Sequence, residues 1–373
     1  MYSRLYSFDK SRLVQHRLLA GGWLLMSILL ASPAIDLAHA EDLPVPTGEE
    51  VVAPDAKWEL LFTRTAPIEG GLTEGPAVAP DGSIYFSDIP FGAHKGMILR
   101  YDPKTNETSV FTDDSGKSNG LTFDKDGNLI ACEGSDGGGR RVSRWDIKTG
   151  QSTTVADGYK GKRFNAPNDI VIDSKGRIYF SDPRYLGTEP QELKYKAVYR
   201  IDTDGTVHEV THEVTKPNGV ALSPDEKTLF VANHDNGTDQ IGGPDKNPKL
   251  GIMTIYSFPL GKDGLVKGKR KTLVDFGDTP GCDGMTIDEH GHIYLTARSP
   301  KRPGVMVIDD TGKEVAFIPT GMPNQKEGDP LVGIPSNVEF GIGDEANVLY
   351  TTIDKSLYRI TLKVKGHHPE YQK

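Results

Sequence analysis

Residues 168–180 read Asn-Asp-Ile-Val-Ile-Asp-Ser-Lys-Gly-Arg-Ile-Tyr-Phe: a polar pair, a short apolar run, a turn and a second apolar run. The Lys-Gly step supplies the positive φ that a tight hairpin turn needs, and β-branched and aromatic residues flank it. The stretch therefore predicts a β-hairpin whose first strand follows directly on Asn168.

The same hairpin signature recurs along the chain, and each copy is introduced by a polar residue. These residues are separated by 45, 49, 50, 65 and 54 positions. They are Glu74, Asn119, Asn168, Asn218, Asp283 and Asn337. A unit of about 50 residues with about four short strands is typical of a propeller blade. The sequence thus predicts an all-β, six-bladed β-propeller over residues 71–362, in preference to a β-sandwich or a β-helix.

The six polar residues occupy equivalent positions, so a closed ring of blades would bring them to one axis. Two of them, Glu74 and Asp283, are carboxylates and the other four are amides. Such a ring of hard oxygen donors suits a calcium-like ion, so a central metal site is expected. The alternative is a hydrogen-bonded ring filled with water.

Both ends of the chain are expected to lie outside the propeller. Residues 1–40 combine a basic start, an apolar run over 18–31 and an Ala-x-Ala ending, which is typical of a signal peptide. This predicts export to the periplasm or beyond, with a retained anchor as the alternative. Residues 41–70 are expected to be a lead-in, flexible up to Pro54, and the start of the propeller; 363–373 are expected to be a polar, frayed tail.

Composition narrows the set of partners. The net charge of −9 argues against nucleic acid and is compatible with holding a cation. Beyond the signal peptide no long apolar stretch predicts membrane insertion. Cys132 and Cys282 would lie in different blades, so two free buried thiols are favoured over a disulfide. A monomer or small homo-oligomer is expected.

Further polar residues are candidates for substrate contact. Arg163 lies in the polar run that precedes Asn168, although it could instead form a salt bridge with a neighbouring blade. Tyr185 follows the next strand of that blade and returns to the same face. His234 ends a strand near the expected pocket mouth, where a solvent-facing role is the alternative. The long loop 236–250 is a candidate lid.

With these motifs the chain resembles the gluconolactonase family, which includes regucalcin and is related to diisopropylfluorophosphatase and the paraoxonases. The matching motifs are Glu74-Gly-Pro, Arg163-Phe-Asn-Ala-Pro-Asn-Asp169, Pro217-Asn-Gly-Val220, Asp283-Gly-Met285 and, less distinctively, Pro335-Ser-Asn-Val-Glu-Phe-Gly341. The resemblance covers 71–362. It implies a divalent ion, Ca²⁺ first with Zn²⁺, Mn²⁺ or Mg²⁺ open, held by Glu74, Asn218 and Asp283, with Asn168 as a ligand or substrate contact.

The resemblance also implies a reaction, the opening of a sugar lactone to an aldonic acid. The ion would polarise the carbonyl while water attacks, and Asp283 is the expected general base, with Glu133 or a metal-bound water as alternatives. Arg163, Asn168, Asn119, Glu133, Tyr185 and His234 are the expected substrate contacts. Gly134 stands where many bacterial relatives have His, which leaves the substrate open. Rival functions are another lactone or organophosphate hydrolase and a non-enzymatic, calcium-stabilised binding propeller.

Overall fold

The computed structural model describes residues 43–65, 71–90, 92, 94–243, 245–325 and 332–369. The predicted signal peptide, residues 1–40, lies outside the described residues, as do the last four residues of the expected tail. Residues 39–373 belong to one compact unit, and everything below concerns that unit.

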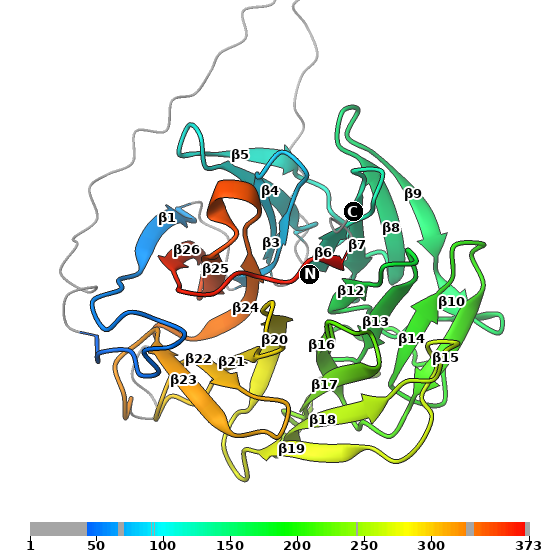
Figure 1. Ribbon diagram of the computed structural model, residues 1–373. Helices are drawn as coiled ribbons and strands as arrows, with labels where there is room; N and C mark the ends of the chain where they lie inside the picture. The colour runs from blue at the N-terminus through cyan, green and yellow to red at the C-terminus, as the bar shows by residue number, and fades with distance from the viewer. Residues whose placement is uncertain are drawn as a thin grey trace, which may run out of the picture. The chain divides into compact units, whose positions relative to one another are not determined.

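Six four-stranded antiparallel sheets are arranged around a common centre, as Figure 1 shows. Blade one consists of β2(Leu72–Val78), β3(Ile84–Ile89), β4(Met97–Asp102) and β5(Glu107–Thr112). Blade two consists of β6(Ser118–Phe123), β7(Leu129–Glu133), β8(Arg141–Asp146) and β9(Gln151–Ala156). Blade three consists of β12(Ile170–Ile172), β13(Ile178–Asp182), β14(Ala197–Ile201) and β15(Val207–Thr211). A small hairpin, β10(Gly158–Tyr159) and β11(Lys162–Arg163), separates the second from the third.

The other three blades complete the ring. Blade four consists of β16(Pro217–Leu222), β17(Thr228–His234), β18(Met253–Pro259) and β19(Lys271–Asp275). Blade five consists of β20(Cys282–Ile287), β21(Ile293–Ala297), β22(Gly304–Ile308) and β23(Glu314–Pro319). Blade six consists of β24(Pro335–Phe340), β25(Val348–Ile353) and β26(Ser356–Thr361), with β1(Glu59–Thr63) as its fourth strand. The described residues contain no α-helix, and the 3₁₀ turn Gly343–Glu345 lies between β24 and β25. The all-β, six-bladed prediction is confirmed.

The last blade is built from both ends of the chain. Strand β1 pairs with β26 and forms the outer strand of the sheet that β24 begins. Arg359 of β26 binds the Glu59 carboxylate at 2.8 Å. This pairing joins the start of the propeller to its end, so the ring cannot open without breaking a sheet.

The expected flexible lead-in is wrong for the residues described. Thr47 pairs with Phe317 of β23 through backbone hydrogen bonds. Val51 and Val52 are buried in the core between blades five and six, because their apolar side chains fill the gap beside Trp58. The segment 43–58 therefore belongs to the fold.

The expected frayed tail is also wrong over its described part. Gly366 bridges to Asp288 beside the hairpin turn of blade five, and His367 donates its backbone N–H to Ile287. Val364 and His368 are buried. Residues 363–369 are thus packed against blade five, because backbone hydrogen bonds and one apolar side chain hold them there.

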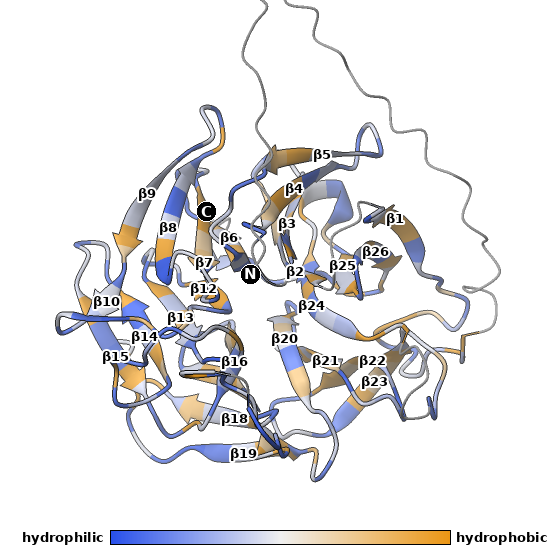
Figure 2. Ribbon diagram, turned by 180° about the vertical axis from the view of Figure 1, so that it is seen from behind, coloured by the Kyte–Doolittle hydropathy of each residue, from blue (hydrophilic) through white to orange (hydrophobic). Residues whose placement is uncertain are grey.

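Apolar cores lie between neighbouring blades. Six clusters of buried apolar residues each join two consecutive blades, the last one joining blade six to blade one. Along the strands the hydrophobic residues form bands, while the connecting loops are mostly hydrophilic (Figure 2). Burial of apolar surface between blades is thus the main force that closes the ring.

Two further expectations concern single features. Cys132 and Cys282 are free and buried, as predicted. Within the described residues no helix has the length and apolar character needed to cross a membrane.

Candidate active site

The innermost strands carry a β-bulge at the repeated polar residue. In β2 the register shifts between Glu74 and Ala77, and comparable shifts occur in β6, β16 and β20 at Asn119, Asn218 and Asp283. A bulge bends its strand and re-aims the side chain beside it. The bulge is therefore the local feature of the backbone that directs these side chains away from the sheet.

A glycine follows the polar residue in these four blades, and a side chain at this position would clash with the next blade. A Cβ on Gly75 would lie 2.2 Å from the carbonyl oxygen of Asn119, and one on Gly219 would lie 2.4 Å from that of Asp283. Gly120 and Gly284 are equally crowded by Asn168 and Asn337. Each glycine thus lets the next blade's polar residue approach the axis.

Blade three has Asp169 where those blades have glycine. Its carboxylate accepts hydrogen bonds from the backbone N–H of Val220 at 2.9 Å and from Nδ2 of Asn337 at 3.1 Å. Burial raises the pKa of Asp169 to about 7, against the effect of these hydrogen bonds. Asp169 therefore links blade three to blade six across the ring. Its carboxylate binds the side-chain amide of Asn337, and Asn337 does not line the cavity described next.

One cavity of about 280 Å³ opens where the other ring residues meet. It is lined by Glu74, Asn119, Asn168, Asn218 and Asp283, which the repeat predicted, and by Tyr185 and His234. Residues 134–136, Lys117, Asn236, Thr238 and Arg298 also line it, together with apolar residues such as Leu72, Ile89 and Leu186. The structure thus brings together the four expected metal ligands and four of the six expected substrate contacts.

Arg163 and Glu133 do not line this cavity. The exposed Arg163 donates from Nη2 to the carbonyl oxygen of Gly139, on the glycine-rich loop. Glu133 is buried behind that loop, where Oε2 pairs with Arg141 at 2.9 Å. Both residues therefore support the wall of the site, and neither reaches its interior.

Tyr185 fixes the orientation of Asn218. The Nδ2 group of Asn218 donates to the Tyr185 hydroxyl at 3.0 Å, and that hydroxyl donates to the His234 carbonyl at 3.1 Å. Burial raises the pKa of Tyr185 well above its ordinary value, so the hydroxyl keeps its proton. With its amide nitrogen engaged, Asn218 has its side-chain oxygen left for a ligand.

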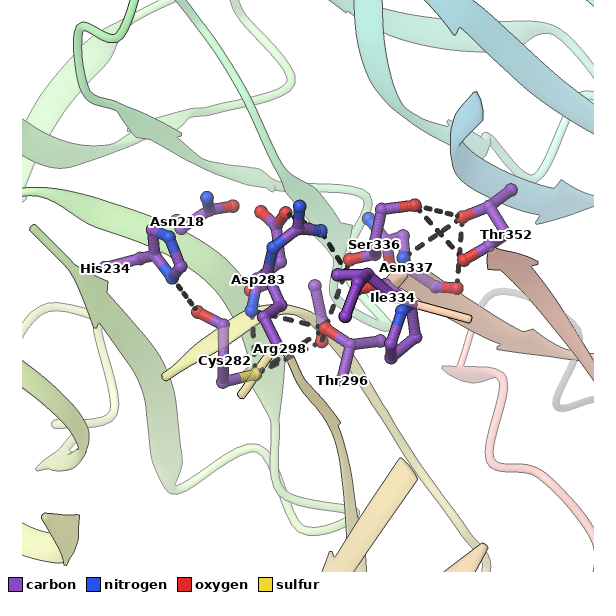
Figure 3. Close-up of polar contacts among 12 residues, drawn as sticks. Asn218, His234, Cys282, Asp283, Thr296, Arg298, Ile334, Ser336, Asn337 and Thr352 are labelled. Atoms are coloured by element: carbon purple, nitrogen blue, oxygen red, sulfur yellow. Dashed lines mark hydrogen bonds and ion pairs between the residues drawn. The ribbon is translucent and has the colours of Figure 1, made fainter. Parts of the chain in front are cut away.

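His234 is held in one orientation at the end of β17. Its ring Nδ1 lies 3.0 Å from the carbonyl oxygen of Cys282, as Figure 3 shows. Its backbone N–H donates to Lys216, and its ring meets that of Tyr185 edge-on. Burial lowers the pKa of His234, with the carboxylate of Asp283 acting in the opposite direction.

Arg298 is a site residue that the sequence analysis missed. Its Nη1 lies 2.8 Å from Oδ2 of Asp283 and donates to the carbonyl oxygen of Pro335 at 2.9 Å (Figure 3). It directly follows β21, the second strand of blade five, just as His234 ends the second strand of blade four. Comparing the ends of second strands across the repeat, in addition to the starts of first strands, could have found it.

Charge at the site leaves one carboxylate without a partner. Asp136 pairs with Lys117 at 2.7 Å and Asp283 with Arg298, but no described cation pairs with Glu74. Glu74 is only 4% exposed. Burial, and then repulsion by Asp283, raise its pKa well above the ordinary value. A buried carboxylate of this kind is stabilised when a cation binds beside it.

The donor set fits a hard divalent ion. Among the described residues no group of three or more His, Cys, Asp or Glu side chains could hold a metal. An ion at Glu74 and Asp283 would therefore need amide oxygens as well, and Asn168 and Asn218 line the same cavity. Oxygen-only coordination from carboxylates and amides is the preference of Ca²⁺.

The long loop 236–250 is tethered beside the cavity. Lys216, almost fully buried, donates from Nζ to Asn236 at 2.8 Å and also to the Thr238 carbonyl. Thr238 in turn donates to the Tyr185 carbonyl at 3.3 Å. Two of its first residues, Asn236 and Thr238, form part of the cavity wall, and its role as a lid stays a prediction.

Comparisons with known proteins agree with this architecture. The pattern of the SMP-30/gluconolactonase/LRE-like region matches residues 72–352. A gluconolactonase of Zymomonas mobilis is 30% identical over 356 residues, which cover 90% of this chain and 86% of the relative. The pentonolactonase XacC of Haloferax volcanii is 30% identical over 243 residues, covering 63% and 69%. A solved gluconolactonase structure from Xanthomonas campestris has a TM-score of 0.68 at 26% identity, covering 89% of this chain and 99% of that one.

Proposed function

The chain belongs to the SMP-30/gluconolactonase/LRE-like family, and from this premise we propose that it is a metal-dependent hydrolase that opens sugar lactones to aldonic acids. Relatives named gluconolactonase, pentonolactonase and lactonase support lactone hydrolysis. Two of these names refer to sugar lactones, which supports the narrower substrate class.

One observation carries the proposal: the buried Glu74, which pairs with no described cation, lines the same cavity as Asp283, Asn168 and Asn218. These four residues would hold a divalent ion, Ca²⁺ by preference. When bound, such an ion supplies Lewis-acid polarisation of a carbonyl oxygen. A cavity of about 280 Å³ whose wall combines apolar residues with a few charged, amide and hydroxyl groups is suited to a small-molecule substrate.

The chain's own residues provide orientation. Tyr185 holds the Asn218 amide so that its oxygen is left for a ligand, and Arg298 holds Oδ2 of Asp283. Lys117 and Asp136 form a paired, polar edge to which hydroxyl groups of a substrate could bond. These fixed groups favour one pose of the lactone, and positioning of this kind lowers the barrier to attack by water.

The contact with Arg298 weakens the expectation that Asp283 is the general base. Oδ2 of Asp283 already accepts a hydrogen bond from the guanidinium, so it is not free to take a proton from water. Glu133, the sequence-based alternative, lies outside the cavity. Asp283 is therefore proposed as a ligand, and another residue that lines the cavity is proposed as the proton acceptor.

A pH-stat assay with glucono-δ-lactone tests the proposed function. Metal-loaded protein should release acid well above the uncatalysed rate, EDTA should abolish the excess, and added Ca²⁺ should restore it. Metal-loaded protein that releases acid from no aldonolactone at more than the background rate would reject the proposal.

A further inference from the structure

The reaction requires a group that takes a proton from the attacking water, and the acids near the cavity are already engaged. Arg298 binds Asp283, and Lys117 binds Asp136. Glu74 lines the same cavity and is proposed as a ligand of the cation. Tyr185 keeps its proton and donates it to a backbone carbonyl. This leaves one lining residue with an ordinary proton-accepting atom, His234.

Hydrogen bonding sets the protonation pattern of the His234 ring. A carbonyl oxygen only accepts, so the 3.0 Å contact with Cys282 places a proton on Nδ1. In a neutral imidazole the other nitrogen, Nε2, then carries a free lone pair. Among the described residues only the Nδ1 atom of this ring has a hydrogen-bond partner, and His234 lines the cavity.

The fold explains why His234 is held in this way. The bulge in β20 shifts the register between Cys282 and Met285, at the point where the Cys282 carbonyl meets His234 of blade four. The same bulge presents Asp283 to the cavity. One distortion of β20 therefore orients both a proposed ligand and the imidazole.

We propose that Nε2 of His234 is the general base of the hydrolase, a role that rests on the proposed lactonase function. Water forms a bond to the lactone carbonyl carbon and gives one proton to Nε2. The tetrahedral intermediate then breaks its ring C–O bond, and the departing alkoxide takes that proton back from Nε2. Lactone and water become one hydroxy acid, and the imidazole returns to its starting state.

Two variants and a rescue experiment test this role. His234→Gln retains an amide that can donate to the Cys282 carbonyl but cannot take up a proton. His234→Ala leaves space for an added imidazole. Both should lose about 10²–10⁴ in kcat, with little change in KM and unchanged Ca²⁺ binding by calorimetry. His290→Ala, in an exposed hairpin turn, is the matched control and should be fully active.

Added imidazoles separate catalysis from positioning. Imidazole should restore turnover to His234→Ala, and a series of small imidazoles should rescue it more strongly as their basicity rises. A kcat within tenfold of wild type in His234→Gln overturns the proposal, as does a rescue that is absent or independent of basicity. Wild-type protein is assayed first, because an inactive wild type rejects the lactonase proposal itself, whereas active wild type and active His234→Gln reject only this role.

Discussion

At the residue scale, single contacts determine which role each side chain of the ring can take, that of a metal ligand or that of a general base. Asp283 and Glu74 occupy equivalent places in the repeat, yet only Asp283 is paired with a guanidinium. The pairing makes the two acids unequal, because Arg298 contacts Asp283 directly and acts on Glu74 only from a greater distance. Such differences arise from a neighbour outside the repeat motif, Arg298, and they separate a ligand role from a base role.

Asp283→Asn distinguishes these roles. The amide keeps an oxygen ligand but loses a charge, so we expect weaker Ca²⁺ binding; at saturating Ca²⁺, turnover should stay within about tenfold of wild type. Calorimetry and kcat measured at several Ca²⁺ concentrations check this. A loss of about 10²–10⁴ in the metal-saturated variant would return the general base to Asp283.

Tyr185→Phe removes the partner of the Asn218 amide. We expect Ca²⁺ affinity to fall by about 10–100-fold, as is usual when a residue that orients a ligand is lost. Calorimetric titration of the metal-free protein measures the change. Tyr195→Phe, at a partly exposed tyrosine that stacks on His212, is the control and should bind Ca²⁺ normally. Equal affinity in both variants would remove Tyr185 from the metal site.

At the scale of elements, the bulged inner strands connect the repeat to the site. Each combines a polar side chain for the cavity with a glycine for contact with the next blade. The polar residue was visible in the sequence as a feature of function. The glycine beside it has a packing role that only the neighbouring blade reveals.

Gly219→Ala tests this packing role. Its Cβ would meet the Asp283 carbonyl, so we expect the free energy of unfolding to fall by about 1–3 kcal/mol and Ca²⁺ binding to weaken. Denaturant unfolding and calorimetry give the two values. Gly82→Ala, at a positive-φ turn position with open space around it, should lower stability but leave Ca²⁺ binding unchanged. Normal Ca²⁺ binding by Gly219→Ala would show that the ring tolerates displacement of Asp283.

Prediction from sequence succeeded where a local pattern repeats. The hairpins and the polar residue before each inner strand follow from turn chemistry and alternation, which act over a few residues. The positions of Arg163 and Glu133 outside the cavity could not be predicted, because they depend on the 134–141 loop, whose Gly139 lies against both side chains. Arg298 belongs to no motif, and its meeting with Asp283 depends on the geometry of blade five.

For the whole molecule, the N-terminal segment is part of the propeller. Residues 43–58 fill the core between blades five and six, and β1 completes the last sheet. Neither contact could be foreseen from the segment itself, because its Pro- and acid-rich composition resembles that of a linker. The partners lie more than 250 residues away, as with Trp58 and Pro319.

Truncation tests the contribution of this segment. A chain beginning at Glu41 should fold to an all-β protein with a cooperative thermal transition, because it keeps every described contact. A chain beginning at Arg64 lacks β1 and the 43–58 segment, so we expect it to aggregate or to melt at a much lower temperature. Circular dichroism follows both. Equal melting temperatures would contradict the structural role of the segment.

The shared sixth blade also sets the order of events during folding. Glu59 meets Arg359 only after the chain has been made 300 positions further on, so no incomplete chain contains a finished ring. Blades one to five can form as they emerge, since their strands are neighbours in the sequence. The last step joins the two ends of the chain and carries a large loop-closure cost. We therefore expect the slowest phase of refolding to be the docking of β1 onto β26, which substitutions in β1 would slow while those in blade three would not.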